Sequence, residues 1–276
     1  MQLSVACAKP PRPPSTESHV LNHELVLSNP KVQRLRRLIG RRSARGDEGV
    51  IVVEGETLIR EALDAGLVPE SLFMASGTQA IADAGAVHVL APGVIERIAS
   101  TKAAQPYVAV FRQPTEPRHL LPTARFVVAA WDVSDPGNLG TMMRSAEAAG
   151  AELFVVSART ADPTSPKVVR ASAGSIFRLP VVVVESWAEL HREGRTVMGT
   201  SSHRGTSYFE SDLRRDIVLV FGNESQGLDE TVSVDEWITI PHAGPAESLN
   251  VAMACTILCF EMARQRRVLS GTVDAP

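Results

Sequence analysis

The chain has 276 residues, of which 44% are hydrophobic and 21% are charged, and its formal net charge is -3. This length suits one large or two ordinary domains with packed cores. The longest apolar runs, such as 126–131 and 217–221, are far shorter than the ~20 residues that a membrane-spanning helix needs. The composition therefore excludes a membrane span and favours a globular protein, although a slightly acidic average can hide local basic patches.

The N-terminal segment and the cysteines bear on the cellular compartment. MQLSVACAKPPRPPSTES has no basic start followed by a long apolar stretch, and residues 9–18 contain four prolines among polar residues. We therefore expect a disordered leader over 1–22 and no export. Besides Cys7, the chain has Cys255 and Cys259 at helical i, i+4 spacing, with no further ligands to complete a metal site. We expect a buried pair of free thiols in a reducing cytoplasm and no metal.

Residues 31–45 contain seven basic residues and no acidic one. Their apolar residues recur at helical spacing, so a helix would bury that stripe and present Arg34, Arg37 and Arg41 together on another face. Such a face could follow a phosphate backbone, or it could be an ordinary solvated helix face. The segment alone does not decide between the two.

The first half of the chain predicts a small α/β domain over 23–113. A strand at 50–53 is followed by a helix that ends near Gly66, and short strands are expected at 71–75, 86–90 and 107–111. Residues 112–125 contain three prolines and little periodicity, which is typical of a linker. We place this linker at 114–124 and a second domain at 125–270.

The second half has a more regular pattern. Apolar strands are expected at 126–133, 152–157, 179–184, 196–200, 217–221 and 237–240, with helices at 138–149, 167–173 and 248–267. Continuously apolar strands that are separated by helices indicate a mostly parallel sheet covered on both faces. Ligands of such sheets bind outside the carboxyl ends of the strands, so the residues that follow each strand are the candidates for a site.

Three such segments contain polar residues in unusual density. DVSDPGNLGTMMR places Asn138 near a helix N-terminus and Arg144 six residues later; a turn with Asn138 as a helix cap is the alternative. LVFGNESQG ends a strand with four further candidates, which are Gly222, Asn223, Glu224 and Gly227. A glycine there lets a ligand approach the main chain, although a tight turn would look the same.

The third segment, ITIPHAGPAESLNV, opens the last helix with Ser248, Leu249 and Asn250. Ser248 could simply be an N-cap, and His242 is more typical of a loop residue than of a base, since no carboxylate lies near it in sequence. The chain lacks the glycine patterns of dinucleotide-binding folds and of P-loops at these places, so the common nucleotide folds are not supported.

Taken together and in this order, N-x5-R, G-x-E-x-x-G and P-x6-S-L-N-V resemble the three signature motifs of the SpoU/TrmH family of RNA ribose methyltransferases. The resemblance covers 125–267, and PKVVRASAGSIFRLPV at 166–181 is similar to that family as well. NPKVQRLRRL and VVEGETLIREAL resemble the L30e-like substrate-binding domain of many members. The fold class implied is α/β, with a trefoil-knotted, parallel-sheet SPOUT methyltransferase domain preceded by a small L30e-like α/β domain.

The resemblance also implies a cofactor and a set of roles. S-adenosyl-L-methionine would be held by main-chain groups and side chains of six residues, which are Thr200, Gly222, Asn223, Gly227, Ile240 and Leu249. Arg144 would act on the ribose hydroxyl. The nucleotide would be positioned, and Arg144 braced, by four further residues, namely Asn138, Glu224, Ser248 and Asn250. Because a guanidinium keeps its proton in proteins, two roles stay open for Arg144: proton acceptor and phosphate clamp.

The expected partner is RNA, with 23S ribosomal RNA favoured over tRNA because the N-terminal domain resembles those used on structured rRNA. Arg170 and Ser172 are further candidates for RNA contact, besides the basic helix. The resemblance implies a homodimer formed through the C-terminal domain and a cytoplasmic location. A non-catalytic RNA-binding protein of the same fold, or a ribosome component with an appended domain, are the alternatives. The sequence identifies neither the modified nucleotide nor a housekeeping or antibiotic-resistance role.

Overall fold

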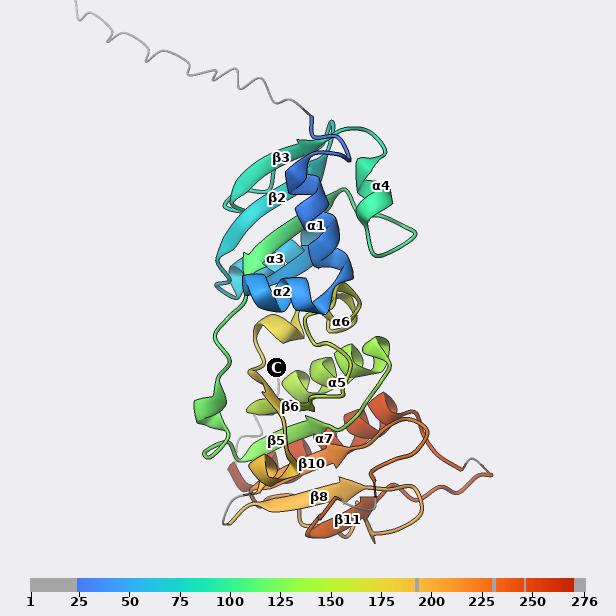
Figure 1. The fold of residues 1–276 in the computed structure, drawn as a ribbon. Coiled ribbons are helices and arrows are strands. Elements are labelled where there is room, and N and C mark those ends of the chain that lie inside the picture. Colours follow the sequence, from blue (N-terminus) through green and yellow to red (C-terminus); the bar gives the residue numbers. More distant parts are fainter. Residues whose placement is uncertain (1–23, 192–193, 230–231, 246, 271–276) are drawn as a thin grey trace, which may run out of the picture.

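The structure is a computed structural model that describes residues 24–191, 194–229, 232–245 and 247–270. The predicted leader at 1–22 and Cys7 lie outside these residues. Two sheets stand one above the other along the long axis of the molecule, and the N-terminal half lies at the top of Figure 1. No helix in the described part of the chain is long and apolar enough to cross a membrane. The predicted domain boundaries themselves stay predictions.

The N-terminal sheet has the strand order β1-β4-β2-β3, in which only β2 and β3 are parallel. Its strands are β1 (Val50–Glu54), β2 (Pro69–Ala75), β3 (Ala86–Leu90) and β4 (Tyr107–Arg112). All four occur where the apolar runs predict them, within two residues. One face packs against α1 (Pro30–Gly40), α2 (Arg42–Glu48) and α4 (Val94–Ile98), and the other against α3 (Glu56–Asp64).

The basic segment does not form one helix, contrary to expectation. Helix α1 ends at Gly40, and Arg41 is extended, with φ -130° and ψ 121°. Glycine is a poor helix former, and the turn lets α2 fold back so that Ala44 and Arg45 are buried. Arg41 therefore does not continue the helix face that carries Arg34 and Arg37.

The C-terminal sheet is parallel throughout, with the order β7-β6-β5-β10-β8-β11-β9. Its strands are β5 (Phe126–Ala130), β6 (Leu153–Ser157), β7 (Val181–Val184), β8 (Thr196–Thr200), β9 (Thr206–Ser207), β10 (Ile217–Phe221) and β11 (Glu236–Thr239). The prediction of a parallel α/β sheet is confirmed. The two-residue strand β9 is too short to leave a periodic pattern in the sequence.

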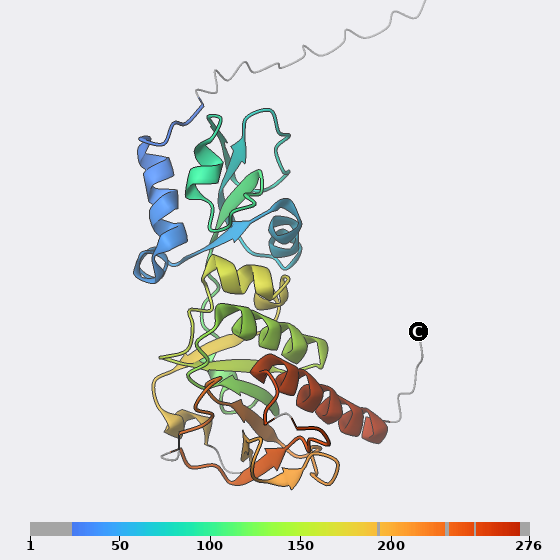
Figure 2. The ribbon, with the colours of Figure 1, turned by 90° about the vertical axis from the view of Figure 1, so that its right-hand side faces the viewer.

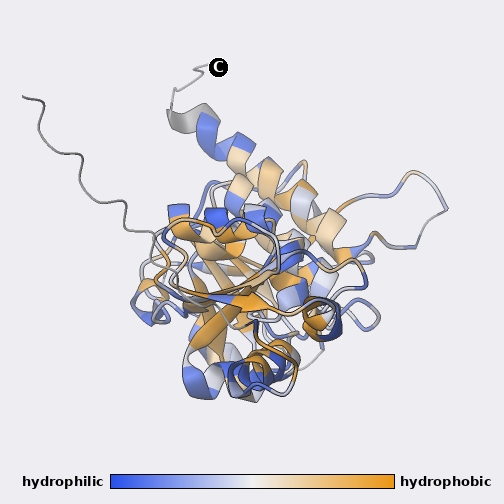
Figure 3. Cartoon of the chain, turned by 90° about the horizontal axis from the view of Figure 1, so that it is seen from above, coloured by the Kyte–Doolittle hydropathy of each residue, from blue (hydrophilic) through white to orange (hydrophobic). Residues whose placement is uncertain are grey.

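The two faces of this sheet are covered differently. Helices α5 (Pro136–Ala148) and α7 (Val251–Ser270) pack on one face. The other face is covered by the 3-10 helices η1 (Arg118–Leu120) and η3 (Trp187–Leu190) together with loops, so the expectation of helices on both faces holds only in part. Cys255 and Cys259 of α7 are free and buried, with 3.7 Å between their sulfur atoms, as predicted. Seen from above, apolar strands lie inside and polar residues outside (Figure 3).

Helix α6 (Pro166–Ala171) and the 3-10 helix η2 (Ser175–Phe177) lie between the two sheets. Val169 and Phe177 belong to the same buried cluster as Ile51 and Ile59 of the N-terminal domain. Burial of apolar side chains contributes about 1.5–3 kcal/mol each. The two domains therefore share part of one hydrophobic core.

Three arginines join the domains across this interface. Arg45 is buried and pairs with Asp162, Arg170 donates to Glu54 over 2.7 Å, and Arg178 donates to Glu61 over 2.6 Å. Glu54 is only 3% exposed and also accepts two hydrogen bonds from Ser100, at 2.9 and 2.8 Å. These contacts hold the N-terminal domain in one orientation relative to the parallel sheet.

The same interface lies directly against the helix that carries Arg144. A Cβ at Gly140 of α5 would lie 2.5 Å from the Cβ of Ala171 and 2.7 Å from the carbonyl oxygen of Val168. Only glycine lets α5 and α6 approach this closely. The position of Arg144 is thus coupled through α6 to the N-terminal domain.

Candidate active site at the carboxyl ends of the parallel strands

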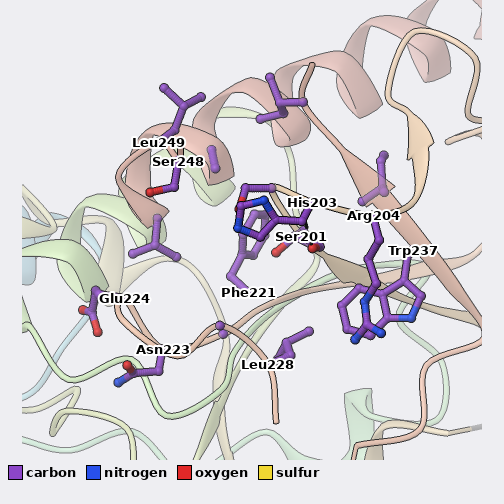
Figure 4. A pocket seen from close by; sticks show the side chains of 18 of the residues that line it. Ser201, His203, Arg204, Phe221, Asn223, Glu224, Leu228, Trp237, Ser248 and Leu249 are labelled. Atoms are coloured by element: carbon purple, nitrogen blue, oxygen red, sulfur yellow. Dashed lines mark hydrogen bonds between the residues drawn. The ribbon is translucent and has the colours of Figure 1, made fainter. Parts of the chain in front are cut away.

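A cavity of about 570 Å³ opens at the carboxyl ends of β8, β10 and β11. Sites for small ligands are usually clefts of ~300–1,000 Å³. All six residues predicted to hold the cofactor line it, namely Thr200, Gly222, Asn223, Gly227, Ile240 and Leu249. Figure 4 shows side chains from the three strand ends and from the start of α7 around one space.

The loop after β10 is a tight turn in which glycine is required. A Cβ at Gly222 would lie 2.2–2.4 Å from backbone atoms of Gly227 and Leu228. Asn223 and Gly227 exchange two backbone hydrogen bonds of 2.9 Å, and Gly227 has φ +70°. The Asn223 side chain donates to the carbonyl of Asp132 over 3.0 Å. This turn brings the main chain to the edge of the cavity.

Glu224 joins this loop to the segment before α5. Its carboxylate accepts from the backbone N–H of Ser134 and of Asp135 at 3.1 and 3.0 Å, and from Asn138 Nδ2 at 3.1 Å. Partial burial opposes ionisation, but these hydrogen bonds outweigh it and lower the pKa of Glu224 from its ordinary 4.5 to about 2. The side chain is therefore a fixed anion and a poor proton acceptor.

The third segment is connected to the same network. Asn250 Nδ2 donates to Asn138 Oδ1 over 3.0 Å, and the Asn250 side-chain oxygen accepts from Ala252 N at 2.9 Å. Asn250, Asn138 and Glu224 thus form one chain of hydrogen bonds that ties the three sequence segments together. Since the ends of β5, β10 and β11 are far apart in sequence, only the fold brings these groups together.

Neither of the two helix caps that the sequence left open as alternatives, Asn138 and Ser248, occurs in the structure. Asp135, and not Asn138, caps α5, because its side chain accepts from the Asn138 N–H over 2.9 Å. Helix α7 begins at Val251, so Asn250 is its cap and Ser248 lies in the preceding loop, exposed at the cavity. Both asparagines consequently have their side chains in the network that joins the segments.

Arg144 lies on α5, exposed, and makes no hydrogen bond or ion pair within the described part of the chain. The expected bracing of Arg144 by Asn138, Glu224, Ser248 and Asn250 is absent in this state, where three of these residues bind one another or nearby backbone groups. Its guanidinium is thus available to an external anion.

The residues predicted to contact RNA have different surroundings. Arg34 pairs with Glu48 and Glu70, both over 2.6 Å, and Arg37 pairs with Glu48 over 3.0 Å. Arg41 is exposed and unpaired within the described residues, as are its neighbours Arg36 and Arg42. Of the three arginines that helical spacing suggested for RNA, only Arg41 is therefore unpaired within the described residues.

Arg170 and Ser172 also differ from expectation. Arg170 bridges the domains through Glu54, and Ser172 is fully buried, with its hydroxyl donating to the Val169 carbonyl over 2.8 Å. A buried hydroxyl cannot contact RNA unless the protein unfolds, so the prediction that Ser172 contacts RNA is wrong. Arg170 serves the domain interface.

Several residues that line the cavity were missed from the sequence. Four of them follow β8, namely Ser201, Ser202, His203 and Arg204. Phe221 and Trp237 belong to β10 and β11, and Leu228 lies in the loop after β10. The guanidinium carbon of Arg204 lies 3.6 Å from the centre of the Trp237 ring. The rule that ligands bind beyond strand ends could have drawn attention to residues 201–204. His242 also lines the cavity, and its Nε2 is buried without a hydrogen-bond partner.

A parallel sheet with a cavity at its strand ends and a polar network beside it defines an α/β protein with a binding site for a small ligand. The model of the SpoU rRNA Methylase family matches residues 125–260, and that of the MRM3-like substrate binding domain matches 29–109. The chain belongs to the SpoU rRNA methylase family and has the MRM3-like domain in front of it. The predicted family resemblance is confirmed.

Similar proteins include named rRNA enzymes. The 23S rRNA (guanosine(2553)-2'-O)-methyltransferase RlmP of Bacillus subtilis is 34% identical, over 85% of this chain and 96% of its own length. The 23S rRNA (uridine(2479)-2'-O)-methyltransferase of Streptomyces viridochromogenes is 31% identical, over 86% and 91%.

Solved structures agree. AviRb of Streptomyces viridochromogenes in complex with AdoMet has a TM-score of 0.79 and 30% identity, covering 87% of this chain and 98% of that one. The AdoMet-bound rRNA methyltransferase of Sinorhizobium meliloti has a TM-score of 0.77 and 32% identity, covering 87% and 97%.

Proposed function

We propose that this protein uses S-adenosyl-L-methionine to methylate the 2'-hydroxyl of one ribose in 23S ribosomal RNA. The observation that carries the proposal is the hydrogen-bonded chain of Asn250, Asn138 and Glu224 beside the cavity. It connects the three motif segments at one place. The AdoMet complexes of similar structures and the rRNA substrates in the names of relatives support the same conclusion.

The cavity residues fit this cofactor. Gly222 leaves no room for a Cβ, so that the main chain itself borders the cavity. Ile240 and Leu249 offer apolar contacts for an adenine, and main-chain groups near Gly222 are available to the adenosine. The Thr200 hydroxyl donates to the Val220 carbonyl over 3.0 Å, so its oxygen can still accept a hydrogen bond.

The cofactor, when bound, would supply the methyl group of its sulfonium; transfer to the ribose 2'-oxygen would break the bond from sulfur to methyl and release S-adenosylhomocysteine and the hydroxyl proton. The enzyme must then orient the hydroxyl and help to remove its proton. We assign Arg144 to the RNA, as a clamp on a phosphate next to the acceptor ribose, because a guanidinium keeps its proton and its planar fork matches a phosphate. Glu224 positions the motif segments and is too weak a base to take the proton.

The test compares the parent with Arg144→Ala and Arg144→Lys. Arg144→Ala should keep cofactor affinity in calorimetry and lose methyl transfer, while Arg144→Lys, which keeps the charge without the fork, should retain a small part of the activity. Unchanged turnover in Arg144→Ala would remove the assigned role.

Mapping of 2'-O-methylated positions in 23S rRNA and in tRNA from cells with and without the protein tests the substrate. One methylated position should depend on the protein. A position that changes only in tRNA would replace the rRNA substrate by a tRNA, and failure of the pure protein to bind the cofactor, with or without RNA, would favour a non-catalytic RNA-binding protein.

We further propose that Arg41, together with Arg36 and Arg42, binds the RNA backbone. Replacing all three by Ala should lower the slope of log affinity against log salt by about one for each phosphate that the protein no longer neutralises. Replacing Arg34 and Arg37, which are paired with glutamates, should change this slope less. An unaltered slope would return the segment to an ordinary solvated face.

A homodimer through the C-terminal domain is also part of the proposal. Helix α7 buries one side in the core and exposes Met253 and Phe260, which are 62% and 47% exposed. The two lie seven residues apart and so on one face of the helix. Figure 2 shows α7 projecting from the body of the domain. The trefoil knot, the cytoplasmic location and the lack of a metal stay predictions.

A further inference from the structure

The cavity has a cationic side that the proposed function leaves unexplained. Arg204, in the loop after β8, lines the same cavity as Glu224, and Figure 4 shows the two side chains on opposite sides of it. Among the described lining residues Arg204 is the only Arg or Lys, whereas Glu224 and Glu247 contribute carboxylates. The cavity thus has its positive and negative groups separated in space.

The position of Arg204 is set by the backbone next to it. Gly205 has φ +115°, and a Cβ there would lie 2.5 Å from the carbonyl carbon and oxygen of Trp237. Only glycine allows the loop to lie this close to β11. As a result the Arg204 guanidinium lies over the Trp237 ring, 3.6 Å from its centre.

The ring is held in turn from the sheet. A Cβ at Gly199 of β8 would lie 3.0 Å from the Trp237 ring, so ring and strand are in close contact. A guanidinium that is stacked on an aromatic ring keeps the N–H groups at its edge free for an anion in the plane of the guanidinium. Arg204 makes no other hydrogen bond or ion pair within the described part of the chain.

The proposed cofactor has two cationic groups, a sulfonium and an ammonium, and a single carboxylate. Paired N–H donors of a guanidinium match a carboxylate in geometry and charge. The carboxylates of Glu224 and Glu247 suit the cationic groups, and the fixed anion at Glu224 lies in the network that joins the motif segments. Charge complementarity therefore favours one orientation of the cofactor, with its carboxylate toward Arg204.

We propose that Arg204, stacked on Trp237, binds the carboxylate of the methionine part of the cofactor. This inference rests on the proposed function. It makes Arg204 the residue that distinguishes the full cofactor from adenine nucleosides without the amino-acid group.

The test uses two probes that differ in that group. S-adenosylhomocysteine has the carboxylate, and 5'-methylthioadenosine lacks it. By calorimetry on the full chain, Arg204→Ala should lower the affinity for S-adenosylhomocysteine about tenfold, as expected for loss of a charge-assisted pair. The affinity for 5'-methylthioadenosine should stay within about twofold of the parent value. Arg204→Lys should lose less affinity for S-adenosylhomocysteine. Trp237→Phe should also weaken S-adenosylhomocysteine more than 5'-methylthioadenosine, but by a smaller factor. Arg214→Ala, an exposed arginine paired with Asp212 outside the cavity, is the matched control and should change neither probe.

Each other outcome has a defined meaning. Equal weakening of both probes in Arg204→Ala, or no weakening, overturns the inference and leaves the proposed function intact. Weaker RNA binding with unchanged S-adenosylhomocysteine affinity would assign Arg204 to the RNA and also overturn it. If neither probe binds the parent protein, the proposed function itself fails. Arg204→Ala alters an exposed loop side chain, so its fold is checked simply by circular dichroism.

Discussion

Replacing Arg170 by Met tests the ion pair that joins the two domains. Loss of one partner of a buried pair costs about 3–5 kcal/mol, because an uncompensated charge is left behind. Glu54 is 3% exposed, but it keeps two hydrogen bonds from Ser100, and the Arg170 side chain is 29% exposed. We therefore expect Arg170→Met to lower the free energy of unfolding by about 2–3 kcal/mol, below the value for a fully buried pair.

The assay is urea unfolding followed by circular dichroism. The double variant Arg170→Met with Glu54→Gln removes the stranded charge and should return to within about 1 kcal/mol of the parent. Arg264→Ala, which breaks a pair with Glu261 on α7 in which the arginine is 64% exposed, is the control and should leave the midpoint nearly unchanged. A loss below about 1 kcal/mol in Arg170→Met would refute the reasoning, since the pair would then behave as a surface pair.

Three further variants test the cavity and the dimer. Gly222→Ala should abolish S-adenosylhomocysteine binding in calorimetry, because its Cβ would lie 2.2–2.4 Å from backbone atoms of the facing turn. In Gly227→Ala the new Cβ meets no atom and only the positive φ is unfavourable, so this variant should still bind S-adenosylhomocysteine. The pKa of Glu224 is lowered from 4.5 to about 2, so its ionised form stabilises the fold above pH 4.5 and this contribution is lost as the pH falls toward 2. In Glu224→Gln the midpoint of thermal unfolding should depend less on pH over that interval. A pH dependence equal to that of the parent would contradict the assigned network. Met253→Glu with Phe260→Glu should give a monomer in sedimentation velocity, whereas an unchanged mass would place the dimer interface elsewhere.

The strands and six of the residues that line the cavity could be predicted because their signals are local. A continuous apolar run such as 217–221 predicts a buried parallel strand, and the glycine that follows it marks the close approach of backbone to cavity. All six proposed cofactor residues lie within a few residues of a strand end or helix start. Local pattern and family resemblance were sufficient for this part of the site.

Roles that depend on a distant partner could not be predicted. Arg34 looked free for RNA, but Glu70 approaches it from β2 and Glu48 from α2. The place of Arg204 after a strand could have drawn attention to it, but its contact with Trp237 of β11, far along the chain, could not be predicted. A sequence shows which residues are basic. Tertiary contacts decide which of these residues stay unpaired and so remain available to RNA.

The shared core beneath the N-terminal sheet limits how this architecture can be recombined. Val169 and Phe177 complete a cluster with Ile51 and Ile59, although they belong to the catalytic half of the chain. A foreign substrate domain joined at the proline-rich linker would meet a surface shaped for other side chains. An exchange of substrate domains, by evolution or in a designed chimaera, therefore has to bring matching residues of α6 and η2 with it.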